Sequence, residues 1–490
     1  MKVKIVLTLI ILFTSSFFTK AQFVEDALRF VSPNVFPSVR AASLGASYFG
    51  FADDGTAIVT NPAGMTLVPV GEFGMGINLT NHKTNTNFLG NEKKELTNEF
   101  YFTNINFVWA NPTTNLNVYD NEIKENDFKI SYGFDYHLSN DFVVNSTYRG
   151  FNPLNTFIAE QAYQKQDWVT QVGLADENYN TLIKNNMYQD GFVYESGGMH
   201  NLSFGVACDI NPMFAIGGTF IMKVGTYNYS RKYFEIDKDN IYNQYYIDYI
   251  HQLSVRENLT QDLFGITGIL GFQARLSHYC RLGLSVHFPT LMHDSEYFAT
   301  NYEVLFDDDK LVKYPLGTMF NEYKIITPFE FILGLSGNTS GLSYSISGSI
   351  LNAAIAYFSV DKNNINLDYG ALLHFDELNE IIDEAFTTQF TIGAGLEYKI
   401  PDIPVYLRGS YTLQTSPYKN KTLCSNKNII GTGVGLLLTN NLILDASFVY
   451  ATQDYRRANY GNESVPMYFS FYNVKHTPTN FQLGIRYRFN

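Results

Sequence analysis

The residues best suited to chemistry in this sequence are a group of metal-ligand types between positions 287 and 296. His287, His293, Asp294 and Glu296 carry the imidazole and carboxylate groups that hold metal ions in proteins. They could meet at one rim of a β structure and bind a metal, although the same residue types are common at a solvated rim. We interpret them as ordinary rim residues, and the sequence predicts neither a metal site nor a cofactor.

Other arrangements that resemble catalytic or ligand-binding motifs fail on their spacing. Gly431, Gly433 and Gly435 alternate along one strand-like run, so they are lumen-facing or close-packing positions and not a phosphate-binding loop. Asp237 and Asp239 lack the glycine and the glutamate that an EF-hand loop requires. No Ser/His/Asp or Cys/His signature accompanies the scattered histidines. We therefore predict that the protein is not an enzyme.

Composition limits the class of protein that must position any site. The chain has 490 residues, of which 45% are hydrophobic, 16% aromatic and only 17% charged, with a net charge of -13. An acidic chain without a basic patch is not expected to bind nucleic acid. After the N-terminus no apolar run approaches the roughly 18 to 20 residues of a membrane-spanning helix. A large β protein remains, either soluble or in an outer membrane.

The first 21 residues have the pattern of a secretory signal peptide. Lys2 and Lys4 precede an apolar stretch from Ile5 to Phe18, and Thr19 and Ala21 occupy the small-residue positions before a cleavage site. No cysteine follows the cut, so a lipoprotein is not indicated. We expect residues 1 to 21 to be removed, residues 22 to 70 to form an N-terminal unit, and residues 71 to 490 to form the main domain.

Strict alternation of apolar and polar residues recurs along the main domain. Similar runs occupy residues 264 to 276, 282 to 288, 390 to 400 and 480 to 489. In a soluble sandwich the apolar face would form the core, whereas in a membrane barrel it would face lipid. In the last run the apolar face is Phe481, Leu483, Ile485, Tyr487 and Phe489, and the opposite face is Gln482, Gly484, Arg486 and Arg488.

The lengths of the connections favour the barrel over the sandwich. Short links alternate with long polar stretches, which is the asymmetry between periplasmic turns and extracellular loops in outer-membrane barrels. Fifteen strand-like runs can be counted, but a barrel with both termini in the periplasm has an even number of strands. Treating residues 128 to 150 as one long strand predicts an antiparallel transmembrane barrel of about 14 strands. The short links are Asn211-Pro212, Ser277-His278, Asn338 to Ser340, Pro401 to Ile403 and Asn440-Asn441; the long stretches are about 151 to 199, 231 to 261, 290 to 324, 358 to 386, 415 to 426 and 453 to 479.

Residues 22 to 70 are too rich in small side chains to supply further strands. The stretch from Val39 to Leu67 contains many Ala, Gly and Ser residues, which allow backbones to pack closely, and turn signals at Asp53-Asp54-Gly55 and Asn61-Pro62. A compact unit directly before an alternating barrel indicates a plug. Farther on, Leu378, Ile381, Ile382 and Ala385 form one helical stripe, which predicts a loop helix packed on the barrel mouth.

These features resemble the FadL/TodX type of outer-membrane transporters for long-chain fatty acids and other hydrophobic compounds. The strongest match lies in the N-terminal unit, with further similarity spread along the barrel. The residues that carry the resemblance are Arg40-Ala41, Ser43 to Ala46, Ala52 to Asp54, Thr56-Ala57, Asn61-Pro62-Ala63-Gly64, Thr327 to Phe329, Phe375 to Asn379 and Ser416 to Tyr418.

The resemblance implies a barrel in the bacterial outer membrane whose lumen is closed by an N-terminal hatch. Asn61, Pro62, Ala63 and Gly64 would be hatch residues near the gate, and Gly133 is a candidate for a kink in the third wall strand. The implied partners are hydrophobic small molecules, such as fatty acids and aromatic hydrocarbons, together with membrane lipid and lipopolysaccharide. We expect the protein to act as a monomer.

Two other functions are compatible with the same barrel. The protein could serve as a shuttle or scaffold in a protein secretion system, which requires a stable protein partner and no hydrophobic ligand. It could instead be a surface receptor or adhesin, for example for haem, whose loops bind a ligand that does not pass through.

Overall fold

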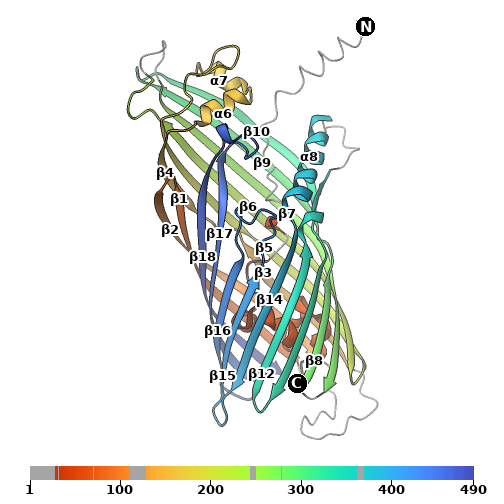
Figure 1. The fold of residues 1–490 in the computed structure, drawn as a ribbon. Coiled ribbons are helices and arrows are strands. Elements are labelled where there is room, and N and C mark those ends of the chain that lie inside the picture. The colour runs from red at the N-terminus through yellow and green to blue at the C-terminus, as the bar shows by residue number, and fades with distance from the viewer. Residues whose placement is uncertain are drawn as a thin grey trace, which may run out of the picture.

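The computed structural model describes residues 28–30, 33–69, 71–110, 129–242, 250–277, 279–360 and 369–489. The expected signal peptide at residues 1 to 21 lies outside these ranges. Antiparallel strands form one continuous sheet that closes on itself, because β1 (Gly71–Phe88) pairs with β18 (Ser470–Phe489) from Gly71 opposite Phe489 to Asn87 opposite Asn473. Figure 1 shows the resulting tilted barrel. Closure excludes the soluble sandwich.

The sheet contains eighteen strand segments that occupy fourteen positions in the wall. At four of these positions the wall strand is interrupted and consists of two consecutive segments that pair with the same adjacent wall position. These segment pairs are β3 with β4, β8 with β9, β10 with β11, and β12 with β13. The fourteen-stranded barrel predicted from the sequence is therefore confirmed. The remaining segments are β2 (Asn91–Ala110), β3 (Ile130–Asp141), β4 (Ser146–Asn152), β5 (Met187–Asn211), β6 (Phe214–Ile236), β7 (Ile250–Ser277), β8 (Cys280–His287), β9 (Leu291–Phe306), β10 (Leu311–Ile326), β11 (Glu330–Thr339), β12 (Leu342–Asn352), β13 (Tyr357–Ser359), β14 (Thr388–Lys399), β15 (Val405–Gln414), β16 (Lys427–Leu437) and β17 (Leu442–Tyr460).

The apolar face of each strand points out of the barrel, as a membrane barrel requires. In β18 the side chain of Leu483 is 59% exposed while that of its neighbour Gln482 is 1% exposed. The exposed apolar residues form a belt around the lower part of the wall, whereas Asn81, Lys83 and Asn85 face outward higher on β1. The belt identifies the part of the wall that contacts lipid. Its members include Phe204, Phe220, Phe264, Leu270, Leu284, Phe331, Leu333, Ile346, Ile392, Leu396, Leu407, Phe481 and Leu483.

The two ends of the barrel differ in their connections. The five short links expected from the sequence each join consecutive strands at the lower end, where the C-terminus also lies (Figure 1). The expected long loops are shorter than predicted, because the strands continue far beyond the apolar belt. For example, β9 and β10 form a hairpin from Leu291 to Ile326, most of which the sequence indicated as loop. In this region the apolar residues of β9, such as Phe298, Tyr302 and Val304, face inward, and its outward face mixes polar and apolar residues, so the pattern of a lipid-facing strand is lost.

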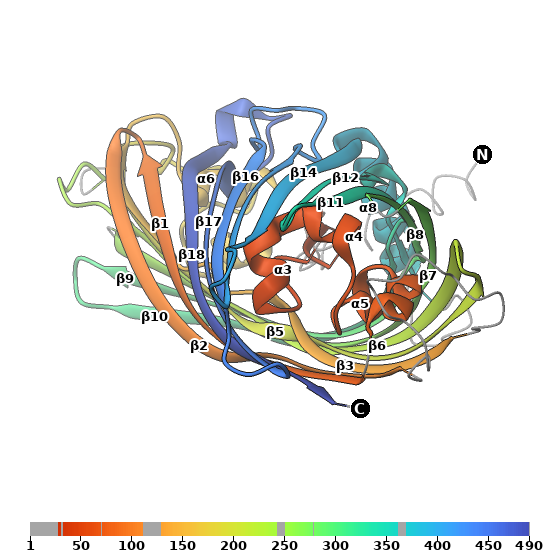
Figure 2. The same cartoon turned by 90° about the horizontal axis from the view of Figure 1, so that it is seen from below.

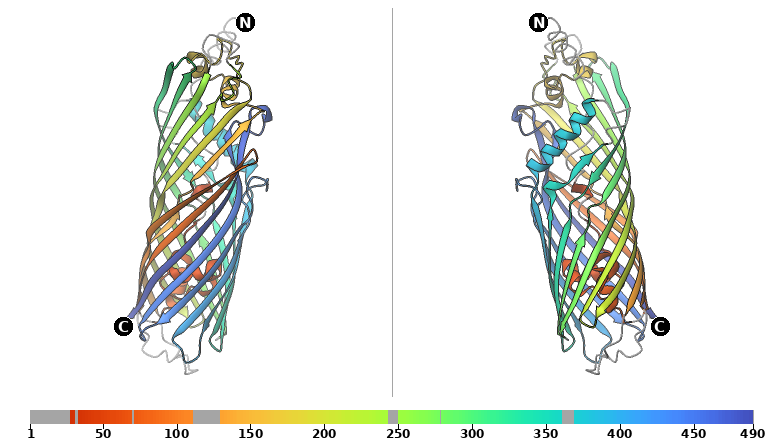
Figure 3. Two further views of the ribbon diagram at one scale, coloured as in Figure 1. Left: turned by 90° about the vertical axis from the view of Figure 1, so that its left-hand side faces the viewer. Right: turned by 90° about the vertical axis from the view of Figure 1, so that its right-hand side faces the viewer.

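Helices cover the upper end of the barrel. Helices α6 (Phe157–Tyr163) and α7 (Asp167–Gln171) bury Phe157 and Trp168 in a cluster with Tyr233 and Tyr302 from the strands below. Helix α8 (Tyr369–Ala385) lies beside β13 at the mouth, as Figure 3 shows, and buries Leu378 and Ile382. The predicted loop helix is thus confirmed. None of the helices in the described ranges is long and apolar enough to cross a membrane.

The third wall position is irregular above its midpoint. Strand β3 pairs with β2 only from Ser131 to His137, and a register shift follows between Leu138 and Asn140 on the β5 side. Strand β4 then pairs with β5 but not with β2. Side chains bridge the gap instead, since Asn145 Nδ2 donates to Thr97 Oγ1 at 2.9 Å. The merging of residues 128 to 150 into one wall position is confirmed, with an interruption inside it.

A chain of short helices lies inside the lower half of the barrel, and we call it the hatch segment (Val39–Leu67). Viewed from below in Figure 2, α3, α4 and α5 lie within the ring of strands. Ser38 begins the segment by accepting a hydrogen bond from the Ala41 amide at 3.1 Å. Its parts are α3 (Val39–Leu44), the 3₁₀ helix η1 (Gly45–Ser47), α4 (Tyr48–Phe51), α5 (Ala57–Thr60) and the 3₁₀ helix η2 (Pro62–Leu67).

Small residues let the hatch segment touch the wall. Gly45 has a φ of 55°, and a Cβ atom on it would lie 2.6 Å from Thr412 Oγ1 in β15. Only glycine satisfies both the left-handed backbone and this contact without strain. The run of Ala, Gly and Ser in the sequence therefore reflects close packing between plug and barrel.

Candidate functional site

Ion pairs fix the first half of the hatch segment to the wall. Arg40 in α3 contacts Asp53 at 2.7 Å, Asp54 at 2.9 Å and Glu397 of β14 at 3.0 Å, with a side chain only 6% exposed. Arg281 of β8 reaches the second oxygen of Asp53 at 3.2 Å. The arginine thus joins two hatch acids to a wall acid, inside the lumen, where water screens charges weakly.

The same network continues along the neighbouring strands. Arg408 of β15 lies 2.6 Å from Glu397 and 2.6 Å from Asp445 of β17, and Arg486 of β18 lies 2.7 Å from Asp445. Arg486 also approaches Asp54 of the hatch segment at 3.5 Å. Arginines and carboxylates alternate, so each buried charge has an opposite partner, as buried ions require. We call these residues the ionic network: Arg40, Asp53, Asp54, Arg281, Glu397, Arg408, Asp445 and Arg486.

The hatch acids are held in their ionised form. Burial alone would raise the pKa of the Asp54 carboxyl, but the charges of Arg40 and Arg486 hold that pKa well below its usual value. Asp53 behaves in the same way: burial opposes ionisation, and Arg40 and Arg281 lower its pKa. Tyr48 donates to Asp54 at 2.5 Å, and burial together with this carboxylate raises the pKa of the phenol. At neutral pH the network therefore contains charged acids and a neutral tyrosine.

The second half of the hatch segment carries the Asn-Pro-Ala-Gly turn, which contacts the wall without charges, whereas Thr66 after it accepts hydrogen bonds from the wall cations Arg275 and Lys129. Asn61 is buried, and its Nδ2 donates to the Phe272 carbonyl of β7 at 3.1 Å. Pro62 begins η2, and the Gly64 amide donates back to the Asn61 carbonyl at 2.8 Å. A Cβ atom on Gly64 would lie 2.0 Å from the Ala52 carbonyl oxygen, so no larger residue fits.

Three wall glycines receive this turn. A Cβ atom on Gly217 would lie 2.6 Å from the Ala63 amide nitrogen, and one on Gly271 would lie 2.2 Å from Asn61 Oδ1. A Cβ atom on Gly283 would lie 2.9 Å from Asn61 Nδ2. These residues belong to the adjacent strands β6, β7 and β8. Because these three wall positions are glycines, the turn packs directly against the backbone of the wall.

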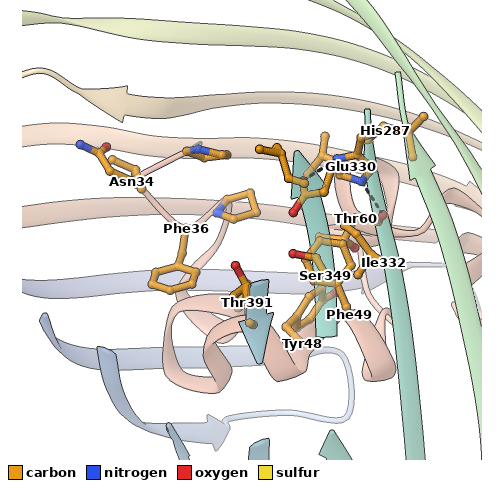
Figure 4. A pocket seen from close by; sticks show the side chains of 18 of the residues that line it. Asn34, Phe36, Tyr48, Phe49, Thr60, His287, Glu330, Ile332, Ser349 and Thr391 are labelled. Carbon is orange, nitrogen blue, oxygen red and sulfur yellow. Dashed lines mark hydrogen bonds and ion pairs between the residues drawn. The ribbon is translucent and has the colours of Figure 1, made fainter. Parts of the chain in front are cut away.

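A cavity of about 240 Å³ lies directly above the hatch segment. Figure 4 shows Tyr48, Phe49 and Thr60 of the hatch segment forming one side of it and Ile332 of the wall another. We call it the upper-hatch cavity. Its lining combines polar and apolar side chains, and the apolar ones also include Val35, Phe36, Val59, Ile221, Ile269, Phe288 and Leu351.

Polar groups also contribute to this lining. His287 Nε2 lies 3.2 Å from the Thr60 carbonyl oxygen, and its Nδ1 lies 3.8 Å from Glu330, contacts drawn in Figure 4. Two lysines also reach the cavity, Lys223 from β6 and Lys427 from β16. Neither lysine makes a hydrogen bond or close ion pair to the part of the chain that the structure describes. An apolar chamber with convergent polar groups is typical of small-molecule sites.

A second, polar cavity of about 280 Å³ lies higher in the lumen, beside the interrupted third wall position. His82, Asp141 and His476 line it, and Asn34, Phe36 and Lys427 line both cavities. We call it the polar cavity. Residues 33 to 37 lie between the two cavities, and we call them the strap. The strap is fixed to β3, since Asn34 Nδ2 donates to the Asp141 carbonyl at 2.6 Å.

The structure brings together some of the residues singled out from the sequence and separates others. Asn61, Pro62, Ala63 and Gly64 form one turn below the upper-hatch cavity, and their role as a gate stays a prediction. Gly133 pairs regularly with Val108 and Gly205, and a Cβ atom on it would lie 2.6 Å from Ile58 of the hatch segment. It is therefore a packing position against the plug, and the irregularity of its strand begins at Leu138.

The group at positions 287 to 296 is divided. His287 faces the upper-hatch cavity, whereas Glu296 accepts a hydrogen bond from the Tyr323 hydroxyl at 2.9 Å, higher in the barrel. In the described ranges no group of three or more His, Cys, Asp or Glu side chains is arranged to hold a metal ion.

Solved structures share this architecture. A FadL homologue of Pseudomonas aeruginosa superposes with a TM-score of 0.56 at 13% identity, covering 94% of this chain and all of that chain. The chain has a FadL/TodX-type fold. The Pseudomonas putida toluene transporter TodX matches with a TM-score of 0.50 at 11% identity, and the Ralstonia pickettii toluene transporter TbuX with a TM-score of 0.50 at 13% identity. These cover 94% and 93% of this chain, respectively, and all of each transporter chain. No protein-family model and no curated protein matches the sequence.

The FadL/TodX-type fold is that of a bacterial outer-membrane barrel, as the sequence predicted. Sequence reasoning placed Arg40, Asp53 and Asp54 in the hatch but did not assign them a function. It missed Glu397, Arg408 and the other wall members of the ionic network. A charged residue on the inward face of an alternating strand, such as Glu397, was the only sequence signal for these wall members. Strand periodicity does not show which charged residue in the hatch or on another strand pairs with it.

Proposed function

We propose that this protein carries hydrophobic small molecules across the bacterial outer membrane, through a barrel that its hatch segment closes. The observation that carries the proposal is the upper-hatch cavity, a chamber with much apolar surface that the hatch segment bounds through Tyr48, Phe49, Val59 and Thr60, the residue before the Asn-Pro-Ala-Gly turn. The toluene transporters with the same fold support it. The process requires no covalent step, so we propose no enzymatic activity.

Burial of apolar surface supplies the affinity for such a solute. Each Å² of apolar surface removed from water contributes about 25 cal/mol, so a chain of several methylene groups binds without any specific polar contact. Phe36, Phe49 and Ile332 provide apolar surface from the strap, the hatch segment and the wall, respectively. Solute would then enter the chamber by exchange from the lumen above it.

We further propose that long-chain fatty acids are among the solutes. Lys223 and Lys427 place two ammonium groups at this chamber. A carboxylate would compensate their charge, while its acyl chain would contact the apolar lining. Uncharged aromatic hydrocarbons would use the same apolar lining without the lysines.

The gate in this proposal is the second half of the hatch segment. The first half is held by the ionic network, whose separation would leave several charges buried without partners. Within the second half, the Asn61 to Gly64 turn is held by neutral hydrogen bonds, such as that from Asn61 to the Phe272 carbonyl at 3.1 Å, while Arg275 and Lys129 hold Thr66 beyond it. A displacement of the turn away from Gly217, Gly271 and Gly283 would open the chamber at the lowest free-energy cost.

Uptake in cells tests the proposal. Initial uptake of labelled oleate and labelled toluene would be measured in a deletion strain that lacks related transporters, with and without the protein, and with an Asn61→Ala variant. We expect uptake only with the protein and an altered rate in the variant. Binding of these solutes without uptake would indicate a receptor, and neither binding nor uptake would favour a secretion-system scaffold.

A further inference from the structure

Several buried polar side chains on one side of the lumen carry oxygen or nitrogen atoms without a hydrogen-bond partner in the described part of the chain. They lie on the inward faces of β17, β18, β1 and β2, which are adjacent in the wall. Their side chains are at most 8% exposed. In the described part of the chain, the unpartnered atoms on these faces include Asn78 Oδ1, Asn104 Oδ1, Asn106 Oδ1, Ser447 Oγ, Asn480 Oδ1 and both Gln482 Oε1 and Nε2.

The strand register places these residues in one continuous file. Asn78 pairs with Gln482, and the pairs on either side are Thr80 with Asn480 and Gly76 with Gly484. On the other side of β1, Asn104 is opposite Gly76. From Asn480 to Arg486 the file extends roughly 20 Å at about 3.4 Å per residue. We call it the polar file.

Elsewhere in the lumen the wall hydroxyls are mixed in character. Some are satisfied directly by the hatch backbone, since Ser345 Oγ donates to the Ser47 carbonyl at 2.8 Å and Ser410 Oγ donates to the Ser43 carbonyl at 3.0 Å, whereas others, such as Ser285 Oγ and Ser336 Oγ, have no partner in the described part of the chain. A dry contact between hatch and wall is therefore achieved where the sequence provides matching groups. The polar file lacks such matches, although its side chains are as deeply buried.

The polar file joins two internal spaces. Its upper end, Asn480, lines the polar cavity. Its lower end, with Asn106 and Arg486, lines a smaller cavity of about 10 Å³ between the hatch segment and the wall. Val39 of the hatch segment and Gly484 of the wall both line this smaller cavity, and Val39 Cγ2 would lie 2.7 Å from a Cβ atom on Gly484. Because residue 484 is glycine, the space beside Val39 that any other side chain would fill stays open.

Buried amides require hydrogen-bond partners, and when protein supplies none, water does. Each Asn or Gln side chain in the polar file can bind water through its free oxygen, and neighbouring sites are close enough to share molecules. We propose that the polar file is a hydrated passage through which water and small inorganic ions cross the plugged barrel, separately from the apolar route through the upper-hatch cavity. Val39 is its narrowest point.

Ion conductance of the purified full-length protein in planar lipid bilayers, in potassium chloride, tests this passage. We expect a small, steady conductance from the wild type. The double variant Asn78→Leu, Gln482→Leu replaces the central amides by apolar groups of similar size, so conductance should fall several-fold. Val39→Ala removes two methyl groups at the narrow point and should raise conductance several-fold. Thr391→Val, which alters the lining of the upper-hatch cavity, should leave conductance unchanged.

Absence of conductance in both the wild type and Val39→Ala would overturn the proposal, as would equal conductance in all four proteins. Heat-modifiable migration in gels verifies that each variant is a folded barrel. The outcome is separable from the transport of hydrophobic compounds, because oleate uptake is measured on the same variants. Uptake that persists in the double variant while conductance falls would establish two routes, and conductance without uptake would contradict only the transport proposal.

Discussion

Arg40 in α3 and Glu397 in β14 form a buried, two-point ion pair: Arg40 Nε and Nη2 each donate to a different Glu397 oxygen at 3.0 Å. The pair connects the plug to a wall strand 357 residues later in the chain. Asp53 and Asp54 contact the same guanidinium, so its loss would leave three acids with fewer partners. The hatch segment is thus asymmetric: its first half contributes charged side chains to the ionic network, whereas the Asn61 to Gly64 turn makes only neutral contacts with the wall.

Substitution of Arg40 by methionine should release the charged half of the hatch segment. Removing one member of a buried ion pair typically costs about 3 to 5 kcal/mol, because the other member keeps its charge without compensation. Hydrogen exchange of the hatch amides, measured by mass spectrometry on the purified barrel, should accelerate accordingly. Arg149→Met breaks an ion pair with Asp190 whose arginine is 59% exposed, and this control should leave hatch exchange unchanged.

Acidification should loosen the hatch segment. Asp53 and Asp54 have folded-state pKa values below their usual 3.8, so their contribution to hatch docking is complete above that pH. This contribution is lost as the pH falls below about 4, because the two carboxylates then bind protons more readily when the hatch segment is released than when it is docked. Protease accessibility of the hatch between pH 7 and pH 3 measures this. Equal protection across the range, or a loss only at alkaline pH, would contradict the assignment.

A methyl group on the wall glycine under Asn61 should displace the gate. Gly271→Ala would place a Cβ atom 2.2 Å from Asn61 Oδ1, which the turn can avoid only by moving into the lumen. Initial uptake of toluene and oleate should increase several-fold. Gly409→Ala is the matched control, since a Cβ atom at that wall glycine meets nothing within 4 Å. An unchanged rate in Gly271→Ala would indicate that the turn does not limit passage.

Filling the upper-hatch cavity should reduce uptake according to the size of the solute. Ile332→Trp adds bulk to a buried lining position, so oleate uptake should fall more than toluene uptake. Ile346→Trp makes the same change on β12, at a side chain that is 62% exposed on the lipid-facing surface, and should have no effect. A uniform decrease for both solutes with Ile332→Trp would point to misfolding, which gel migration would reveal.

Much of the barrel could be predicted from its strands alone. Phe481 and Leu483 alternate with Gln482 and Gly484, and this pattern holds because lipid faces one side of the strand and the lumen the other. Counting such runs, with the requirement for an even number, led to fourteen wall positions. The upper parts of β9 and β10 were not predicted as strands because no lipid contacts their outward faces there, so nothing requires those faces to be apolar.

The candidate site was predictable only in part. The Asn61 to Gly64 turn could be identified because its residue types constrain the backbone locally. The ionic network could not, since Arg40 and Glu397 meet only after the sheet has closed around the hatch. Gly271 and Gly283 fall on the polar faces of the alternating runs 264 to 276 and 282 to 288, but their contact with Asn61 depends on where the hatch segment lies in the lumen.

The initial rate of labelled oleate uptake tests the central claim most directly, in cells that lack their own transporters for hydrophobic compounds. The comparison is between cells without the protein, cells with it, and cells with the cavity-filled Ile332→Trp variant at equal surface abundance. The account predicts saturable uptake with the wild type, a several-fold lower rate with the variant, and only background without the protein. Uptake at background level with the folded wild-type barrel in the membrane would contradict it.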